Sequence, residues 1–248
     1  EALLLQFNGK VKWAASHKDL TQFIGCVLSN ELVDAFPVHL VKVHAGGIYE
    51  VFIDEGFNEI LMPAGEKIKE YLTEFAPSLM ETLPDGYTTE VDLDSIEWMD
   101  NITTSMERGF IFTIDYGYPA YEYYSLHRTR GTLLCYYRHE VSENPYQRVG
   151  QQDITAHVNF SSLKKLGDER GFKTIGYCPQ GIFLVSMRID EFLLTLADKE
   201  DYQFDALKVK RLLLPEGMGE SHKVLIQYKG EGIPTLSGFS MRNMANTL

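Results

Sequence analysis

Two apolar runs, each followed by polar residues, dominate the hydrophobic pattern of the chain. The first covers positions 23–28 and gives way at once to polar residues 29–31. The second covers 110–114 and gives way to 115–117. Short, continuous apolar runs with polar ends are typical of buried strands in a parallel sheet. We therefore expect two buried strands that lie side by side and lead into functional loops.

The remaining pattern alternates between strands and helices. Alternating apolar positions around Gly46 and Gly47 predict a β-hairpin with arms His39–Val43 and Ile48–Ile53. Helical spacing of apolar residues and turn residues predict the other elements. Helices are expected at 63–77, 92–106, 158–171, 180–198 and 203–214, and strands at 132–137, 173–178 and 222–228. This order predicts an α/β sheet covered on both faces.

The same pattern divides the chain. Residues 1–40 and 105–248 are expected to form the sheet core, and 41–104 an inserted subdomain of hairpin and helices. The chain opens at Glu1 in EALLLQF, which has the pattern of the second half of an amphipathic helix. We expect that a preceding segment has been removed.

Composition narrows the class of protein. The 248 residues include 35 acidic and 23 basic side chains, a formal net charge of −12, which argues against nucleic-acid binding. It favours a small-molecule or basic polypeptide partner. No apolar run approaches the roughly 20 residues of a membrane span, and the start lacks signal-peptide features, so we expect a soluble protein. Cys26, Cys135 and Cys178 are far apart and lack zinc-site spacing. They are predicted to be reduced, buried thiols, with no metal.

The candidate chemistry lies after the two apolar runs. Ligands of open α/β sheets bind beyond the carboxyl ends of the strands. That places Asn30, Glu31 and Asp34 in one loop and Asp115 and Tyr116 in the other. Each carboxylate could be a helix cap or a solvated loop charge. Two such loops at one edge would instead form an acidic crevice suited to a cationic substrate.

Two other segments have less specific interpretations. His157, in DITAHVNFSS, is either a hydrogen-bonded structural histidine or a substrate contact near a helix start, with Asp153 and Thr155 as turn or cap residues. The basic stretch 127–139 is either a solvated face or a functional one. No GxSxG, HExxH, phosphate-loop or EF-hand motif occurs, which removes the commonest hydrolase, nucleotide-hydrolase and metalloprotease interpretations.

Five segments in a fixed order resemble the MidA family of class I (Rossmann-like) methyltransferases. They are SNELVDAFPVHL, FTIDYGY, HRTRGTLLCYYRH, VGQQDITAHVNFSSL and LLPEGMGESHKVLIQYKG, and the resemblance spans roughly residues 11–240. The family includes bacterial proteins and mitochondrial methyltransferases that assist respiratory complex I assembly. The resemblance implies a Rossmann-like sheet and S-adenosylmethionine as methyl donor. The family's glycine-rich cofactor loop would precede residue 1, so no cofactor-binding residue is assigned.

The resemblance also implies roles for the candidate residues. Glu31 and Asp115 would be catalytic, orienting the methyl acceptor, and Asn30, Asp34, Tyr116 and His157 would bind substrate. The implied substrate is an arginine of a basic or arginine-containing protein, in the bacterial cytoplasm or the mitochondrial matrix. Two alternatives remain open: a non-catalytic assembly module of the same fold, and a small-molecule methyltransferase.

Overall fold

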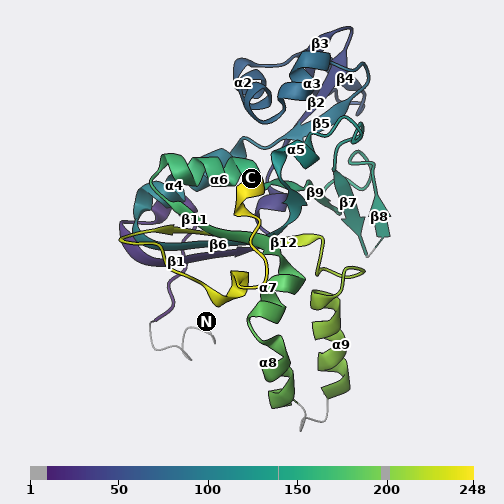
Figure 1. The fold of residues 1–248 in the computed structure, drawn as a ribbon. Helices are drawn as coiled ribbons and strands as arrows, with labels where there is room; N and C mark the ends of the chain where they lie inside the picture. Colours follow the sequence, from purple (N-terminus) through teal and green to yellow (C-terminus); the bar gives the residue numbers. More distant parts are fainter. Residues whose placement is uncertain (1–9, 139, 197–201) are drawn as a thin grey trace.

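The structure, a computed structural model, describes residues 10–138, 140–196 and 202–248, and its largest unit is a mixed five-stranded sheet (Figure 1). The strand order is β1–β6–β12–β11, and the short β10 pairs with β6. The bounds are β1 Phe23–Asn30, β6 Met106–Tyr118, β10 Val158–Asn159, β11 Lys173–Pro179 and β12 His222–Lys229. β1 and β6 are parallel neighbours, as predicted, and β12 runs antiparallel to both β6 and β11.

The register brings three strand ends to one edge of this sheet. Asn30, the last residue of β1, is opposite Ile114 of β6. Because β12 is antiparallel, its first residue, His222, is opposite Tyr116 at the same edge. Residues from three distant parts of the chain therefore meet where parallel strands usually bind ligands.

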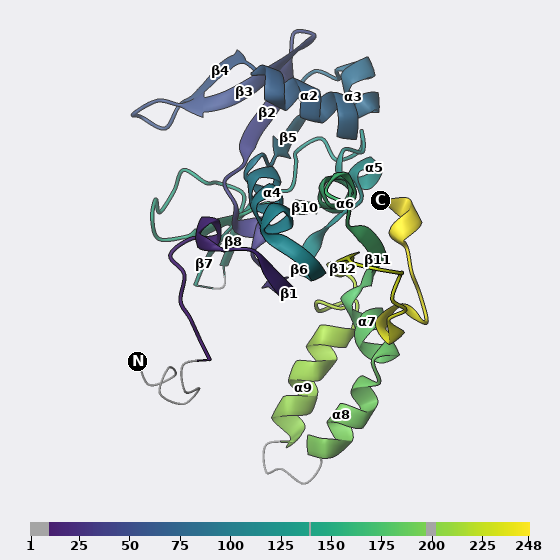
Figure 2. The ribbon, with the colours of Figure 1, turned by 90° about the vertical axis from the view of Figure 1, so that its left-hand side faces the viewer.

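Helices cover both faces of the sheet (Figures 1 and 2). One face packs against α4 and α6 through a core that includes Trp98, Met99 and Phe160. The other face packs against α7 and the 3₁₀-helix η3 through Phe183 and Phe239. The bounds are α4 Asp94–Ser105, α5 Ala120–Tyr123, α6 Phe160–Glu169, α7 Gln180–Ser186, η1 His17–Asp19, η3 Ser237–Phe239 and η4 Ala245–Thr247.

β1 is less buried than the sequence predicts. Phe23 and Val27 pack against the core beneath α4, but Ile24 and Leu28 are 60% and 67% exposed. β1 is the edge of the sheet, and within the described ranges no element covers its outer face. The prediction of a fully buried strand is therefore wrong. So is the prediction that all three thiols are buried, because Cys26 of β1 is exposed.

A second sheet, β4–β3–β2–β5, is antiparallel throughout and packs against α2 and α3. Its bounds are β2 His39–His44, β3 Gly47–Ile53, β4 Glu59–Pro63, β5 Thr88–Val91, α2 Glu66–Phe75 and α3 Pro77–Thr82. β2 and β3 confirm the predicted hairpin. α4, in contrast, packs with the main sheet. The division of the chain at residues 40 and 104 stays a prediction.

A small third sheet and a helix pair complete the described structure. The sheet order is β8–β7–β9, with bounds β7 Leu134–Tyr137, β8 Glu140–Ser142 and β9 Asp153–Thr155. Asp153 and Thr155 are thus strand residues, and Asn159 caps α6 instead by accepting the N–H groups of Ser161 and Ser162. This corrects the prediction that Asp153 and Thr155 open the helix.

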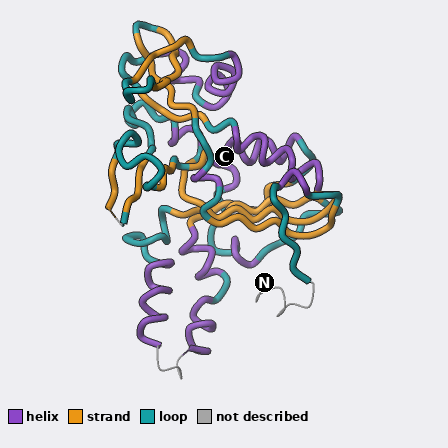
Figure 3. The backbone as a smooth tube through the Cα atoms, turned by 180° about the vertical axis from the view of Figure 1, so that it is seen from behind, coloured by secondary structure: helices purple, strands orange, loops and turns teal. Residues whose placement is uncertain are grey.

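The predicted long helix at 180–198 is two helices. α7 ends at Ser186, Arg188 adopts a left-handed backbone with φ of 61°, and α8 spans Ile189–Leu196. A left-handed residue interrupts an α-helix, which explains the break. α9, Tyr202–Leu213, follows, and the α8–α9 pair projects away from the sheet (Figures 1 and 3).

Some predictions concern residues outside the described ranges. The helix half expected at residues 1–7 and position 139 of the basic stretch both fall there. Within the described ranges, no helix combines the length and the apolar character that a membrane span requires.

Candidate functional site

The loop after β1 turns sharply at Glu31. Its backbone has a φ of 47°, a left-handed conformation that is strained for a side chain of this size, and its N–H donates to the Ile114 carbonyl at 3.0 Å. The 3₁₀-helix η2, Val33–Ala35, follows directly. The turn leaves the Glu31 side chain 45% exposed at the edge of the sheet.

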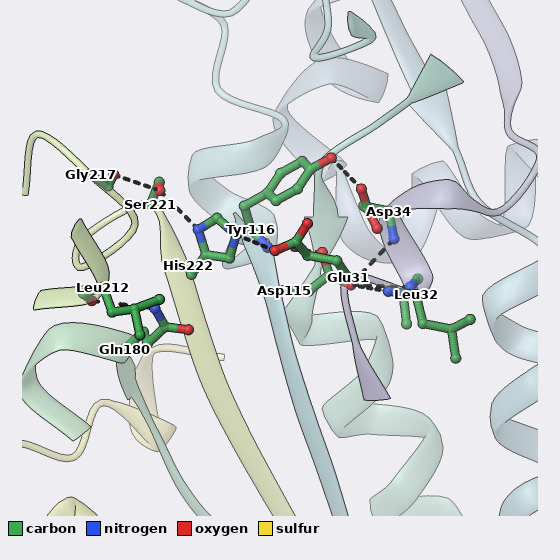
Figure 4. A network of polar contacts seen from close by, with 11 residues as sticks. Glu31, Leu32, Asp34, Asp115, Tyr116, Gln180, Leu212, Gly217, Ser221 and His222 are labelled. Carbon is green, nitrogen blue, oxygen red and sulfur yellow. Dashed lines mark hydrogen bonds and ion pairs between the residues drawn. The ribbon is translucent and has the colours of Figure 1, made fainter. Parts of the chain in front are cut away.

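Asp115 holds this loop in place from the neighbouring strand. Its Oδ2 accepts the backbone N–H groups of Leu32, Val33 and Asp34 at 3.3, 3.1 and 3.4 Å, and its Oδ1 accepts the Tyr116 N–H at 2.9 Å (Figure 4). The residue is 0% exposed. Burial, with a contribution from the charge of Asp34, raises the pKa of Asp115 to about 7, and these N–H groups oppose the rise.

Asp34 faces Tyr116. The Tyr116 hydroxyl donates to Asp34 Oδ2, and the other carboxyl oxygen, Oδ1, is buried with no hydrogen-bond partner among the described residues (Figure 4). Burial raises the pKa of Asp34, and it also raises the pKa of the Tyr116 phenol well above its usual range. A buried carboxyl oxygen without a partner is costly, so Asp34 Oδ1 is an unsatisfied acceptor in the wall of this site.

His222 connects the start of β12 to Glu31. Its Nε2 lies 3.4 Å from Glu31 Oε1, and its Nδ1 lies 3.1 Å from the Ser221 hydroxyl (Figure 4). The ring also meets that of Tyr116 edge-on, with centroids 5.3 Å apart. Burial lowers the pKa of His222, and the charge of Glu31 opposes this. His222 is therefore a mostly neutral ring beside a carboxylate.

His157 is a second histidine in contact with Tyr116. Its ring meets Tyr116 edge-on at 5.1 Å and stacks on Tyr118 at 5.2 Å, and the Arg128 guanidinium covers the same Tyr118 ring at 4.3 Å. Burial, followed by the charge of Arg128, lowers the pKa of His157 to about 4. His157 is therefore neutral at physiological pH.

These residues surround a pocket of about 940 Å³ at the carboxyl edge of β1 and β6. Four of the six predicted site residues line it: Glu31, Asp34, Tyr116 and His157. Asn30 is exposed at the end of β1 and is not among the lining residues, and neither is Asp115. We expected Glu31 and Asp115 to share a substrate cation. The carboxyl groups that line the pocket with Glu31 are instead those of Asp34 and, on β9, Asp153, whereas backbone N–H groups occupy both oxygens of Asp115.

His222 is the main site residue that the sequence analysis missed. The segment before it is a turn that contains Gly217 and Gly219. A Cβ at Gly217 would meet the Arg211 carbonyl oxygen at 2.1 Å, and one at Gly219 would meet that of Leu213 at 2.1 Å, so these glycines let the turn pack on the end of α9. The signal that could have identified His222 is the direction of β12, because the first residue of an antiparallel strand lies at the carboxyl edge of its neighbour.

Residues 2–178 match the model of a family described as S-adenosyl-L-methionine-dependent methyltransferases. The match covers more than half of the chain. This chain belongs to that methyltransferase family. The assignment confirms the family predicted from the five sequence segments, and S-adenosylmethionine is the cofactor of the family.

One curated protein and two crystal structures are similar to this chain. The protein arginine methyltransferase NDUFAF7 homolog, mitochondrial, of Drosophila melanogaster is 26% identical over 231 residues, 89% of this chain and 51% of its own length. A Burkholderia thailandensis protein bound to S-adenosyl-homocysteine is 31% identical, with a TM-score of 0.86 over 100% of this chain and 63% of its own. A native structure from the same organism is also 31% identical, with a TM-score of 0.85, and the match covers 100% of this chain and 67% of that protein. The chain thus spans about half of the curated relative.

The described residues fit the acceptor side of a methyl-transfer site better than the cofactor side. Class I methyltransferases bind their cofactor at a glycine-rich turn between strand and helix, as other Rossmann-like folds do. Gly117 and Gly181 stand at strand-to-helix turns here, but a Cβ on them would meet the carbonyl oxygens of Val158 and Leu213 at 2.1 and 2.4 Å. These glycines permit close packing of the chain on itself, so we assign no described residue to the cofactor.

Proposed function

We propose that the pocket binds an arginine side chain of a polypeptide and that the protein transfers a methyl group to it from S-adenosylmethionine. The observation that carries the proposal is the pair of carboxyl groups, Glu31 and Asp34, that lines one pocket with the Tyr116 ring and the two imidazoles that contact this ring. The family membership and the name of the Drosophila relative support the reaction and the arginine, respectively.

A guanidinium group matches these walls chemically. It is planar and carries five N–H donors, so it can donate to more than one carboxylate while its face rests on an aromatic ring. Asp34 Oδ1 is a buried acceptor in need of a donor, and Glu31 offers a partly exposed carboxylate at the mouth. Tyr116 adds an aromatic surface of the kind that attracts cations.

The two histidines suit a cationic substrate because they are neutral. Burial is the main cause that lowers the pKa of both His157 and His222. Charged imidazolium rings in contact with Tyr116 would repel a guanidinium, and neutral rings do not. His222 also contacts Glu31 at 3.4 Å, which restricts where the Glu31 carboxylate can lie.

The work of the described residues is orientation of the acceptor. When bound, S-adenosylmethionine supplies an electrophilic methyl group. A guanidinium nitrogen would present its lone pair to that group, and the methyl–sulfur bond would break as the N–C bond forms, so that neutral S-adenosylhomocysteine leaves. The proton that the methylated nitrogen loses would pass to the Glu31 carboxylate, which is partly exposed to solvent. Glu31 and Asp34 hold the other N–H groups, stabilise the positive charge and fix the reacting nitrogen in the approach direction. We propose Asp115 as the positioning residue that holds the turn carrying Glu31 and Asp34.

The test is the identity of the methylated atom. This chain, or this chain joined to the part of the Burkholderia protein that it does not cover, is used in whichever form binds S-adenosylmethionine. It is incubated with isotopically labelled S-adenosylmethionine and peptides that differ only in arginine, lysine or citrulline at one position, and products are sequenced by mass spectrometry. We expect label on the arginine side chain alone. Label on another side chain, or on free amines only, would contradict the proposal. The link to respiratory complex assembly and the cellular location stay predictions of the family resemblance.

A further inference from the structure

α9 has a second apolar face, which no described part of the chain covers. Phe204 and Leu207 are 67% and 58% exposed, and Leu214, just beyond the helix, is 39% exposed. The spacing of three and seven residues places them along one side of the helix. Val209, on another side, is buried. A helix that is already packed on one side and still shows an apolar stripe marks an interaction surface.

This apolar stripe, Phe204, Leu207 and Leu214, lines a groove of about 780 Å³. The groove continues past α9 to Met218, Ser221 and His222, which belong to the turn that packs on the end of the helix. The same three residues also line the candidate pocket. The groove and the pocket therefore lie next to each other and share these residues as a wall. Figure 4 shows His222, the first residue of β12, between Ser221 and Glu31 of this wall.

The charges of the two parts are opposite. The groove is lined by Lys208, Lys210 and Arg211 against one carboxylate, Glu216, and Lys208 is paired with Asp205 at 3.0 Å, so Lys210 and Arg211 carry most of its positive charge. The pocket is lined by carboxylates, Glu31, Asp34 and Asp153, with neutral imidazoles. A ligand that complements both needs a cation at one end and an apolar segment with acidic groups at the other. A free amino acid or small amine would fill only the pocket.

We propose that the α9 groove docks the polypeptide substrate next to its target arginine, and that the docked segment carries bulky apolar and acidic side chains. This inference rests on the proposed function, because the arginine is assigned to the pocket. The segment packs on Phe204, Leu207 and Leu214, and its acidic groups meet the basic residues of α9. His222 separates the docked segment from the arginine that enters the pocket.

The experiment compares groove and pocket variants on two probes. The first probe is an array of fluorescent peptides in which one arginine precedes or follows an amphipathic Leu/Glu segment, with spacings from adjacent to one full helical repeat. The second is N-acetyl-arginine amide, followed by NMR shift perturbation. The double variant Phe204→Ser/Leu207→Ser tests the groove, and Glu31→Gln tests the pocket. Leu194→Ser is the matched control, because Leu194 is 74% exposed on α8 and lines neither.

We expect the groove variant to bind the best array peptide about tenfold or more weakly, with N-acetyl-arginine amide unaffected. Glu31→Gln should weaken the binding of both probes, and Leu194→Ser should leave the binding of both unchanged. Two results would overturn the docking proposal. In the first, the wild type binds N-acetyl-arginine amide but binds no array peptide more tightly than that amide. In the second, the groove variant binds the best array peptide as tightly as the wild type does. If N-acetyl-arginine amide does not perturb the pocket at all, the proposed function fails instead. A wild-type dimer by light scattering that the groove variant dissociates would show that a second copy occupies the groove, which also overturns the proposal.

Discussion

Asp115 Oδ2 accepts the backbone N–H of Val33 at 3.1 Å, which joins the central strand of the sheet to the turn that carries the candidate site. The neighbouring N–H groups of Leu32 and Asp34 converge on the same oxygen. A single buried carboxylate thus fixes the backbone from which Glu31 and Asp34 project. We therefore propose an architectural role for Asp115, and its neighbours Glu31 and Asp34 are the groups proposed to meet substrate.

Replacement of Asp115 by alanine should destabilise the protein. It leaves buried backbone N–H groups without an acceptor, and each such group costs about 1–3 kcal/mol. We expect the free energy of unfolding, measured by urea titration, to fall by roughly 3 kcal/mol. The control is Asp153→Ala, which removes an exposed carboxylate that lines the candidate pocket. It should change the free energy of unfolding by less than about 0.5 kcal/mol. Equal effects of the two changes would contradict the architectural role of Asp115.

The raised pKa of Asp115 predicts a pH dependence of stability. The pKa is about 7 in the folded protein against 3.8 in the unfolded chain, so the folded state binds the proton more tightly. The stabilisation that comes from this tighter protonation of Asp115 is fully present below pH 3.8 and is lost as the pH rises through about 7. Relative to Asp115→Asn, the wild type should lose at most about 1.4 kcal/mol per pH unit in this window. Urea unfolding of both proteins from pH 4.5 to 7.5 tests this, and parallel profiles would contradict it.

His157 should remain neutral well below the usual pH for histidine. Its burial and the nearby Arg128 charge set its pKa at about 4. We expect its imidazole NMR signals, assigned by their loss in His157→Gln, to titrate near pH 4. Arg128→Gln removes the second cause and should raise the midpoint, while leaving it below 6.5 because burial remains. A wild-type midpoint near 6.5 would show that His157 is open to water.

This chain by itself should bind S-adenosylmethionine weakly. Gly117 and Gly181, at strand-to-helix turns of the main sheet, are needed for close packing, because a Cβ on either would meet a backbone carbonyl oxygen at 2.1 or 2.4 Å. Isothermal titration calorimetry of the isolated chain measures this directly. Micromolar affinity would mean that the cofactor site lies among residues to which we assign no such role.

Much of the fold could be predicted from the sequence because it follows from local pattern. The parallel pair 23–28 and 110–114 and the hairpin around Gly46 are confirmed in the structure. The exposure of Ile24 and Leu28 could not be predicted, because an apolar run does not show whether a neighbouring element covers it. Nor does apolar composition at 180–198 reveal the left-handed Arg188 that divides the helix.

The candidate site was predictable in its position but not in its details. Strand ends placed Glu31, Asp34 and Tyr116 at one edge, and the structure brings them to one pocket. Which carboxylate lines the pocket depends on the three-dimensional path of the backbone, since the N–H groups that occupy Asp115 lie more than 80 residues away in sequence. The place of His222 in the site depends on the antiparallel direction of β12, and no local sequence pattern reveals that direction.

The measurement that tests the central claim most directly is the rate of arginine methylation by Glu31→Gln, normalised to folded protein, alongside cofactor affinity. It is made on this chain, and on this chain joined to the part of the Burkholderia protein that it does not cover, using whichever form binds S-adenosylmethionine. Glutamine keeps the size of the side chain and removes its charge. We predict a loss of ~2 to 4 kcal/mol of transition-state stabilisation, roughly 30- to 1000-fold in rate, with cofactor affinity unchanged. Wild-type methylation rates in the variant would contradict the assignment of this pocket as the substrate site.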